Sequence, residues 1–248
     1  MDRPLTLVTG GTRGIGAATA LRLAADGHDL VLGYASDDAA AEECRLAVED
    51  TGARCLVVRA DVTEPAGVDR LFARAAAHGR LTGVVNNAGA TLHIGHLAET
   101  PVDVIRRTVE LNLTGALIVA RAAVRALGTS YGGHGGVLVN VSSGAATLGS
   151  PGEYVQYAAA KAGVDALTLG LAQEVAAQGI RVVGVAPGLV RTRIHEDAGD
   201  ADRLVRGAAR VPLGRAGEPA EIADAIAWLM SEQASYVTGT TLRVAGGR

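Results

Sequence analysis

The stretch Leu5–Gly16, LTLVTGGTRGIG, decides the fold because it joins a strand signal to a helix signal through a glycine-rich turn. Its first half is apolar and branched, which is typical of a buried strand, and its end opens an alanine-rich helical segment. Gly10 permits a turn that a side chain would obstruct. Gly14 and Gly16 let the backbone approach a pyrophosphate and let the helix pack close to the strand. The spacing G-x-x-x-G-x-G at this junction therefore predicts a dinucleotide-binding turn.

The same alternation of strand and helix signals continues along the chain. Branched apolar runs predict strands at 5–10, 28–34, 53–62, 81–89, 135–143, 180–188 and 241–247. Alanine-rich amphipathic segments predict helices at 14–27, 37–52, 65–79, 101–127, 154–178 and 218–232. This alternation predicts a parallel sheet of about seven strands, covered by helices on both faces. Since no linker divides the chain, we expect one doubly wound, Rossmann-type α/β domain over residues 1–248.

Composition excludes several classes of function. The formal net charge is −3 with both signs mixed along the chain, which argues against nucleic acid and anionic membranes as partners. No apolar run approaches the ~20 residues of a membrane span, and no signal peptide precedes the first strand, so we expect a cytoplasmic protein. Cys44 and Cys55 lack C-x-x-C spacing and are predicted to be buried thiols. No cluster of ligands predicts a metal site.

Arg13 and the residues after the second predicted strand bear on cofactor choice. Arg13 lies inside the glycine-rich turn, where a long cation can reach a ribose 2′-phosphate. NAD sites place a carboxylate about 20 residues after the turn, at the end of the second strand. Here Ala35 and Ser36 occupy that place, with no carboxylate before Asp37. The pattern favours NADP(H), with Ser36 as a second phosphate ligand. NAD(H) stays possible, since the alternative for Arg13 is a solvated charge.

Tyr157 and Lys161 lie four residues apart in YAAAK, inside a predicted helix. Positions i and i+4 share one face of a helix, so both side chains point the same way. A free tyrosine has a pKa of about 10, and a neighbouring ammonium group favours its phenolate form. The pair is therefore predicted to act as an acid–base unit on one small molecule. Tyr154 is a competitor, but no lysine follows it at i+4.

Further motifs follow the predicted strands in order. They are Asn86-Asn87-Ala88-Gly89, Asn112 in LNLTG, Ser142-Ser143, Tyr157-x-x-x-Lys161 and Pro187-Gly188-Leu189-Val190-Arg191-Thr192. With the glycine-rich turn, these motifs make the chain resemble the short-chain dehydrogenase/reductase family over almost its full length. Members similar to NADP-dependent 3-oxoacyl-carrier-protein reductases and glucose dehydrogenases show the same order.

The resemblance implies a hydride transfer between NADP(H) and a carbonyl or secondary alcohol. Tyr157 would be the general acid and base, Lys161 would tune it and hold the nicotinamide ribose, and Ser143 would bond the substrate carbonyl. Asn112 would support a water that relays protons to Lys161, or would bond local backbone. The gap from Ser143 to Tyr157 is one residue longer than is usual in the family, so Ser142 remains an alternative.

The family pattern also implies a set of cofactor-binding residues. These are Gly10, Thr12, Arg13, Gly14, Ile15, Gly16, Ser36, Asp61, Val62, Asn87, Ala88, Gly89, Tyr157, Lys161, Pro187, Gly188, Val190 and Thr192. Asp61 and Val62 would lie near the adenine, and Pro187, Gly188 and Thr192 would flank the nicotinamide. Asn86 would help to shape the same pocket. The family often has an aspartate where this chain has Ala245.

Partners and substrate follow less closely from the residues. The resemblance implies a homo-oligomer, a tetramer or dimer, packed through the helices predicted at 101–127 and 154–178 and through the C-terminal strand. The substrate is a small carbonyl or alcohol compound, with 3-oxoacyl thioesters, sugars, steroids and small ketones all open. His93 and His96 either line the predicted substrate mouth or are surface histidines without a role. Arg191 and Arg193 either meet an anionic group of the substrate, such as a carboxylate or a phosphopantetheine, or are solvated. The rival functions are an NAD-dependent alcohol or sugar dehydrogenase and a non-catalytic NADP(H)-binding sensor or scaffold.

Overall fold

Seven parallel strands form one sheet in the order β3-β2-β1-β4-β5-β6-β7. The computed structural model describes residues 3–194, 196–200 and 202–248. The strands are β1 (Leu5–Thr9), β2 (Asp29–Tyr34), β3 (Cys55–Arg59), β4 (Leu81–Asn86), β5 (Gly136–Val141), β6 (Ile180–Pro187) and β7 (Thr241–Val244). The strand order reverses between β1 and β4, and in open sheets ligands bind at the carboxyl ends of the strands beside such a reversal.

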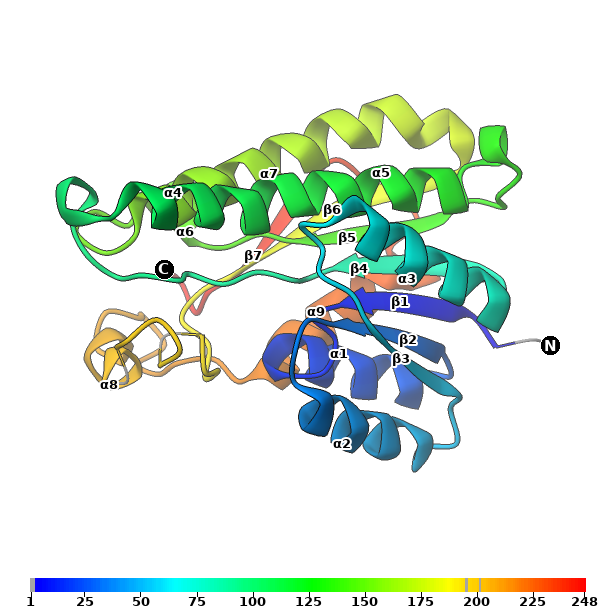
Figure 1. Ribbon diagram of the computed structural model, residues 1–248, viewed down its shortest axis with the longest axis horizontal. Helices are drawn as coiled ribbons and strands as arrows, with labels where there is room; N and C mark the ends of the chain where they lie inside the picture. The colour runs from blue at the N-terminus through cyan, green and yellow to red at the C-terminus, as the bar shows by residue number, and fades with distance from the viewer. Residues whose placement is uncertain (1–2, 195, 201) are drawn as a thin grey trace.

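Helices cover both faces of the sheet, as Figure 1 shows. One layer holds α1 (Gly14–Ala25), α2 (Asp38–Glu49) and α9 (Pro219–Met230). The other holds α3 (Pro65–His78), α4 (Val102–Val109), α5 (Gly115–Leu127) and α7 (Val155–Val175). Two short helices, α6 (Ala145–Leu148) and α8 (Arg203–Ala208), lie outside these layers. The predicted fold class is thus confirmed, from strand number to the two helical layers.

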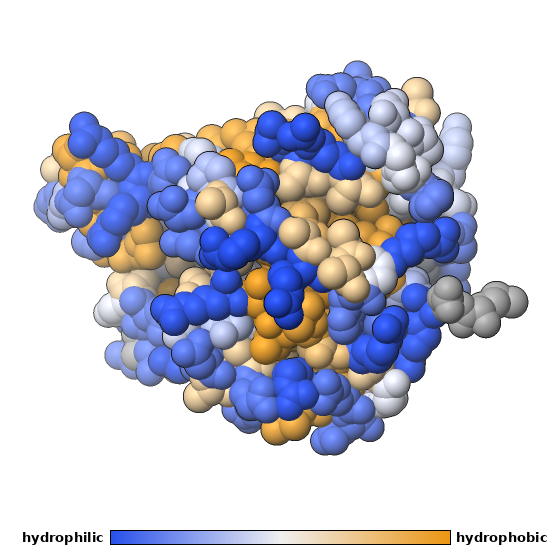
Figure 2. All heavy atoms as spheres, turned by 45° about the vertical axis from the view of Figure 1, so that its right-hand side comes forward, coloured by the Kyte–Doolittle hydropathy of each residue, from blue (hydrophilic) through white to orange (hydrophobic). Residues whose placement is uncertain are grey.

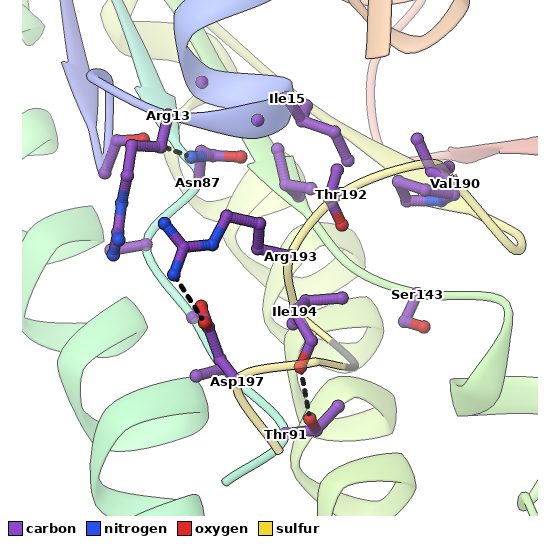
Figure 3. A pocket seen from close by; sticks show the side chains of 18 of the residues that line it. Arg13, Ile15, Asn87, Thr91, Ser143, Val190, Thr192, Arg193, Ile194 and Asp197 are labelled. Atoms are coloured by element: carbon purple, nitrogen blue, oxygen red, sulfur yellow. Dashed lines mark hydrogen bonds and ion pairs between the residues drawn. The ribbon is translucent and has the colours of Figure 1, made fainter. Parts of the chain in front are cut away.

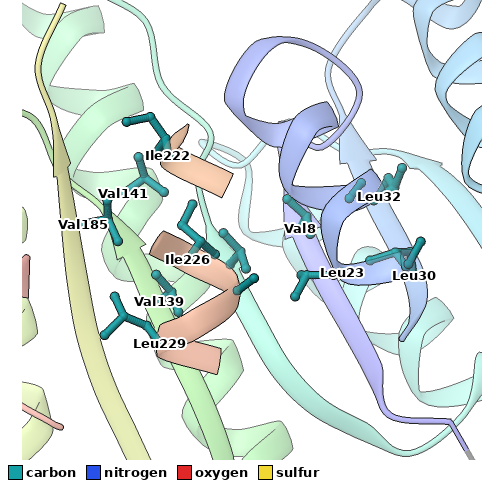
Figure 4. Packing of buried hydrophobic residues seen from close by; sticks show 14 of the residues in the cluster. Val8, Leu23, Leu30, Leu32, Val139, Val141, Val185, Ile222, Ile226 and Leu229 are labelled. Carbon is teal, nitrogen blue, oxygen red and sulfur yellow. The ribbon is translucent and has the colours of Figure 1, made fainter. Parts of the chain in front are cut away.

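Each face of the sheet has its own apolar core. Between the sheet and the α1/α9 layer, Leu23 and Ile226 pack with Val139 and other fully buried side chains (Figure 4). On the opposite face, Leu71 and Leu127 are fully buried in a second cluster. Burying such a side chain contributes about 1.5–3 kcal/mol, so the two clusters hold the strand ends in fixed positions.

The structure differs from the predicted elements in three places. The helix expected at 101–127 is interrupted by a π-helical turn, Glu110–Thr114, which separates α4 from α5. A π turn inserts a residue into the helix and is frequent at functional sites. The short helices α6 and α8 were not predicted, because four or six residues carry too little periodicity to be read. The predicted burial of Cys44 and Cys55 is confirmed, and both thiols are free.

The surface mixes charged and apolar side chains, and Figure 2 shows them interspersed over one face of the molecule. Leu117 on α5 and Leu169 on α7 are 45% and 53% exposed. Within the described part of the chain, no helix is both long and apolar enough to cross a bilayer.

Candidate active site

A cavity of about 1150 Å³ lies where the predicted motifs converge. Its wall is formed by segments at the carboxyl ends of β1 to β7 (Figure 3). The predicted cofactor-binding residues that line it are Gly10, Thr12, Arg13, Gly14, Ile15, Gly16, Ser36, Asp61, Val62, Asn87, Ala88, Gly89, Tyr157, Lys161, Pro187, Gly188, Val190 and Thr192. All of that set is therefore brought together.

The cavity has two ends that differ in composition. We call one the glycine-turn end, which is formed by lining residues among 10–17, 34–47, 60–62 and 87–89. The other is the tyrosine end, which is formed by lining residues among 90–92, 142–161, 187–203 and 243–248.

The glycine-rich turn has the backbone geometry that its sequence requires. Gly10 and Gly14 adopt φ values of +59° and +52°, which side chains rarely tolerate. A Cβ on Gly16 would lie 2.0 Å from the Gly10 carbonyl oxygen, so no larger residue fits there. Because α1 begins at Gly14, the first N–H groups of the helix lack helical partners and face the turn. This arrangement suits an anionic phosphate group.

Thr9 and Asn87 join the turn to the segment after β4. The Thr9 hydroxyl oxygen accepts hydrogen bonds from the backbone N–H groups of Asn87 and Ala88, at 3.0 and 3.1 Å. The Asn87 side-chain amide donates to the carbonyl oxygens of Thr9 and Gly10, both at 3.0 Å. These four bonds hold the two cavity walls in register.

Asn86 does not line the cavity, so its expected role in shaping the pocket is wrong. Its amide is buried and donates to the Ala116 carbonyl and to Asn140 Oδ1, at 2.9 and 3.0 Å. Asn140 in turn donates to the Thr168 hydroxyl at 3.0 Å. Since strand side chains alternate between faces, Asn86 serves this interior network, which links β4 and β5 to α5 and α7.

Arg13 lies opposite a carboxylate that the sequence pattern did not place in the pocket. Its Nη1 is 3.5 Å from Asp37 Oδ2, and the Arg13 side chain is 52% exposed. Asp37 also caps α2, because its Oδ1 accepts a hydrogen bond from the Ala40 N–H at 3.0 Å. Both side chains line the cavity, together with Ser36. An exposed pair of this kind is worth little energy, so Arg13 can turn to a stronger anion.

Tyr157 and Lys161 are buried on the cavity side of α7. Lys161 Nζ lies 5.8 Å from the centroid of the Tyr157 ring and donates to the Val141 carbonyl at 2.8 Å. Burial raises the pKa of Tyr157 above its ordinary value, and a hydrogen bond with Ser143 offsets part of that rise. Burial also lowers the pKa of Lys161, to about 8. Desolvation is therefore the dominant influence on the pKa of Tyr157 in this structure, and it opposes the effect expected of Lys161.

The two adjacent serines have different environments. The Ser143 hydroxyl interacts with Tyr157 and also accepts a hydrogen bond from the Ala145 N–H at 3.1 Å. Ser142 is buried, and its hydroxyl donates to the Lys161 carbonyl at 3.2 Å. The geometry therefore favours Ser143 as the group that faces the tyrosine, and α6 with the loop after it accommodates the longer spacing.

Asn112 lies in the π-helical turn and does not line the cavity. Its amide donates to the carbonyls of Ala90 and Thr108, at 2.8 and 2.9 Å, and its Oδ1 accepts from the Ala90 N–H at 3.2 Å. The expected alternative, bonding to backbone, is thus what the structure shows. A Cβ on Gly89 would lie 2.6 Å from Asn112 Oδ1 and 3.2 Å from Lys161 Nζ. Asn112 therefore fixes the cavity-lining segment beside Lys161.

Several residues at the tyrosine end carry no sequence signal. The Thr91 hydroxyl donates to the Ile194 carbonyl at 3.2 Å and so joins the segments on either side of the cavity (Figure 3). Arg203 on α8 donates to Glu153 at 2.7 Å and to the Tyr154 hydroxyl oxygen at 2.5 Å. Tyr154 is thus engaged by an arginine and does not compete with Tyr157 as the acid.

Of the histidines and arginines expected near the substrate mouth, some line the cavity and others lie outside it. His93 and His96 do not line the cavity. Arg191 is outside it and bonds Glu218 at 2.8 Å. Arg193 does line the cavity, where it lies 3.5 Å from Asp197 (Figure 3).

The known proteins that this chain resembles are described as oxidoreductases, reductases or dehydrogenases. Residues 10–248 match the family model described as enoyl-(acyl carrier protein) reductase. The chain is 42% identical to the uncharacterized oxidoreductase YgfF of Escherichia coli, over 98% of this chain and 99% of that protein. It is also 42% identical to cis-4-hydroxycyclohexanecarboxylate dehydrogenase of Sinomonas cyclohexanicum, over 98% and 95%. A short chain dehydrogenase from Burkholderia cenocepacia, solved in complex with NADP, superposes with a TM-score of 0.90 at 33% identity, over 99% and 97%.

Proposed function

Because the chain belongs to the short-chain dehydrogenase/reductase family, we propose that it is an NADP(H)-dependent reductase of carbonyl compounds that also oxidises the corresponding secondary alcohols. One observation carries the proposal: the buried Tyr157–Lys161 pair and the glycine-rich turn before α1 line the same cavity. A reductase needs both a cofactor site and a proton donor within reach of one carbonyl group.

The residues present fit a nicotinamide dinucleotide. The cradle around Gly10 and Gly16 leaves no room for side chains, and the start of α1 offers unpaired N–H groups to a pyrophosphate. When bound, the nicotinamide supplies or accepts the hydride. Gly188 and Thr192, which also line the cavity, would hold the nicotinamide portion.

The chain's own groups manage the proton and the charge on oxygen. In reduction, Tyr157 would donate its hydroxyl proton to the carbonyl oxygen. Burial raises the pKa of Tyr157, which keeps the hydroxyl protonated but makes it a weaker acid. The Ser143 hydroxyl donates a hydrogen bond to the same oxygen and stabilises the developing charge. Below about pH 8 Lys161 is an ammonium group, and its charge would stabilise the Tyr157 phenolate that remains after the proton transfer. Asn112 keeps the neighbouring backbone in place.

NADP(H) is preferred over NAD(H) in this proposal because Arg13 and Ser36 line the glycine-turn end. The structure solved with NADP for a related chain supports the assignment. NAD(H) is the second candidate, since Asp37 also lines this end and a carboxylate there suits ribose hydroxyls better than a phosphate.

The test is parallel consumption of NADPH and NADH against acyl thioesters, small ketones, quinones and sugars. We expect turnover with NADPH that disappears in Tyr157→Phe. Tight NADPH binding without Tyr157-dependent turnover of any carbonyl would instead favour the sensor function.

We also propose that the protein is a cytoplasmic homo-oligomer that packs through α5 and α7. The exposure of Leu117 and Leu169 on these helices supports the contact. Leu169→Glu should weaken the assembly. Sedimentation of the wild type as a monomer at working concentration would contradict the proposal.

A further inference from the structure

The tyrosine end has a largely apolar wall. Its apolar lining residues are Ala90, Leu92, Ala145, Leu148, Leu189 and Ile194. A wall of this kind receives the hydrocarbon body of a ligand, while a few polar groups fix its orientation. Besides Lys161, four arginines line this end: Arg193, Arg203, Arg243 and Arg248.

Two of the arginines at this end already have carboxylate partners. Arg193 lies 3.5 Å from Asp197, and Arg203 lies 2.7 Å from Glu153. Arg243 differs, because none of the described carboxylates lies within ion-pair distance of it. Asp37, Glu43 and Asp61 line the glycine-turn end instead. Arg243 is also exposed, so water solvates its charge at the cavity wall and an anionic ligand can pair with it.

Arg243 is also held in a defined position. It lies near the end of β7, and its Nη1 donates to the Thr147 hydroxyl oxygen at 2.7 Å. The same hydroxyl donates to the Gly144 carbonyl at 3.3 Å. Arg243 Nη2 lies 3.8 Å from the position that a Cβ on Gly144 would take. The guanidinium group is thus tethered to the turn that directly follows Ser143, with its second nitrogen available to a ligand.

We propose that Arg243 binds a carboxylate of the substrate, so that the enzyme prefers oxo acids, and in reverse hydroxy acids, with an apolar body between the two groups. This inference rests on the proposed reductase function. A guanidinium group binds a carboxylate through short charge-assisted hydrogen bonds. A single tethered guanidinium group can bind a monoanion in this way.

The carboxylate would lie beside Gly144 while the reacting carbonyl reaches Ser143 and Tyr157. Substrates with the apolar body but no charge would still enter the cavity, since its walls are apolar. They would lose the contact that fixes their orientation, and their KM would be higher. The enzyme would therefore have a higher kcat/KM for the carboxylate form of a ketone than for an uncharged form with the same ring.

The test compares 4-oxocyclohexanecarboxylate with its methyl ester, which keeps the ketone and ring but has no charge. We expect the wild type to show a higher kcat/KM for the acid, and Arg243→Gln to lower the acid-to-ester ratio about tenfold or more. Thr147→Val, which removes the tether and leaves the charge, should lower the ratio less. Arg191→Gln is the matched control, because that arginine lies outside the cavity, and its ratio should equal that of the wild type.

A second arm measures binding without turnover. Calorimetry on the complex with NADP⁺ compares cyclohexanecarboxylate with cyclohexanecarboxamide, in the wild type and in Arg243→Gln. Tighter binding of the carboxylate that depends on Arg243 supports the site. The carboxylate site is overturned if the wild type and Arg243→Gln show the same acid-to-ester ratio of kcat/KM and the same affinity for cyclohexanecarboxylate. This holds even if other ketones are still reduced in a Tyr157-dependent way. Loss of turnover for all carbonyls, with the carboxylate site intact, overturns the proposed reductase function instead.

Discussion

The glycine-turn end of the cavity is formed mainly by backbone, and the tyrosine end mainly by side chains. At the glycine-turn end the chain presents backbone: Gly10 and Gly14 have positive φ values, and Gly16 admits no side chain. At the tyrosine end it presents side chains that depend on partners from distant segments, such as Arg203 with Tyr154 and Thr91 with Ile194. Backbone geometry leaves a signature in residue type, because only glycine tolerates it. Contacts between side chains of distant segments do not require one particular residue type, so they cannot be recognised in the sequence. This is why the cofactor is easier to infer than the substrate.

The largest expected effect is at Tyr157, which lies at the tyrosine end and not at the glycine-turn end. Tyr157→Phe removes the proton donor and should lower kcat for ketone reduction by about 10²- to 10⁴-fold. NADPH affinity should stay within about twofold, since the glycine-turn end is untouched. Single-turnover kinetics and NADPH fluorescence titration measure the two quantities. A parallel loss of both would mean that the ends are not separable.

Gly16 probes the opposite end. Gly16→Val would force its Cβ into the Gly10 carbonyl oxygen and should weaken NADPH binding by about a hundredfold or more. A control is Gly170→Ala on α7, where nothing in the same chain lies within 4 Å of the added Cβ; because Gly170 adjoins Leu169 in the proposed subunit contact, the oligomeric state of this variant is measured as well. That change should leave NADPH binding unaltered and raise the unfolding free energy by about 0.5–1 kcal/mol. Normal NADPH affinity in Gly16→Val would refute the backbone account of this end.

Arg13 tests whether the glycine-turn end reads the 2′-phosphate. Arg13→Ala removes a charge-assisted hydrogen bond and should raise KM for NADPH about 10- to 100-fold, with little change for NADH. Arg191→Ala, a cation outside the cavity, serves as the control. Equal losses for both cofactors would remove the basis for NADP(H) preference and favour the NAD-dependent alternative.

The pH profile sharpens the assignment of Lys161. Its pKa of about 8 means that the ammonium form is present below pH 8 and is lost as pH rises through that value. Tyr157, whose pKa is raised, stays protonated over the same range. Ketone reduction at saturating NADPH should therefore fall about tenfold between pH 7 and pH 9. Lys161→Arg keeps its charge and should lack this fall; an identical profile in that variant would show that another group titrates.

The smallest expected effect is at Asp37. Asp37→Asn keeps the cap on α2, because asparagine caps as well as aspartate, and removes one negative charge beside Arg13. NADPH affinity should rise about two- to fivefold, in keeping with the weakness of exposed pairs. Steady-state KM for NADPH and NADH in the variant measures this. A drop in NADPH affinity would show that the carboxylate orients Arg13 rather than competing for it.

These contrasts explain what the sequence could predict. The alternation of apolar and alanine-rich segments predicts all seven strands and the main helices, since periodicity survives in long elements. The motifs also bring the predicted cofactor residues to one cavity. The side chain of Asn86 could not be assigned from the motif, because a strand residue and its neighbour face opposite sides of the sheet. For Asn112 the residue types left two roles open, and the π-helical turn that sets its backbone contacts has no recognisable sequence pattern.

The tyrosine end was the part that sequence could not supply. Arg203 lies in a six-residue helix without periodicity, and its partners are about fifty residues away. The pairing of Arg13 with Asp37 needs the loop conformation after β2. Arg243 had one usable signal: it lies near the carboxyl end of a strand, where doubly wound folds collect functional residues.

The central claim is that this cavity carries a direct hydride transfer between NADP(H) and a carbonyl carbon. The most direct measurement supplies NADPH deuterated at C4 on one face or the other, with an accepted ketone, and analyses the alcohol by mass spectrometry. A fixed cofactor cradle and a fixed Tyr157 predict that deuterium reaches the carbinol carbon from one of the two labelled forms only. Deuterium released to solvent, or transferred equally from both forms, would contradict the account.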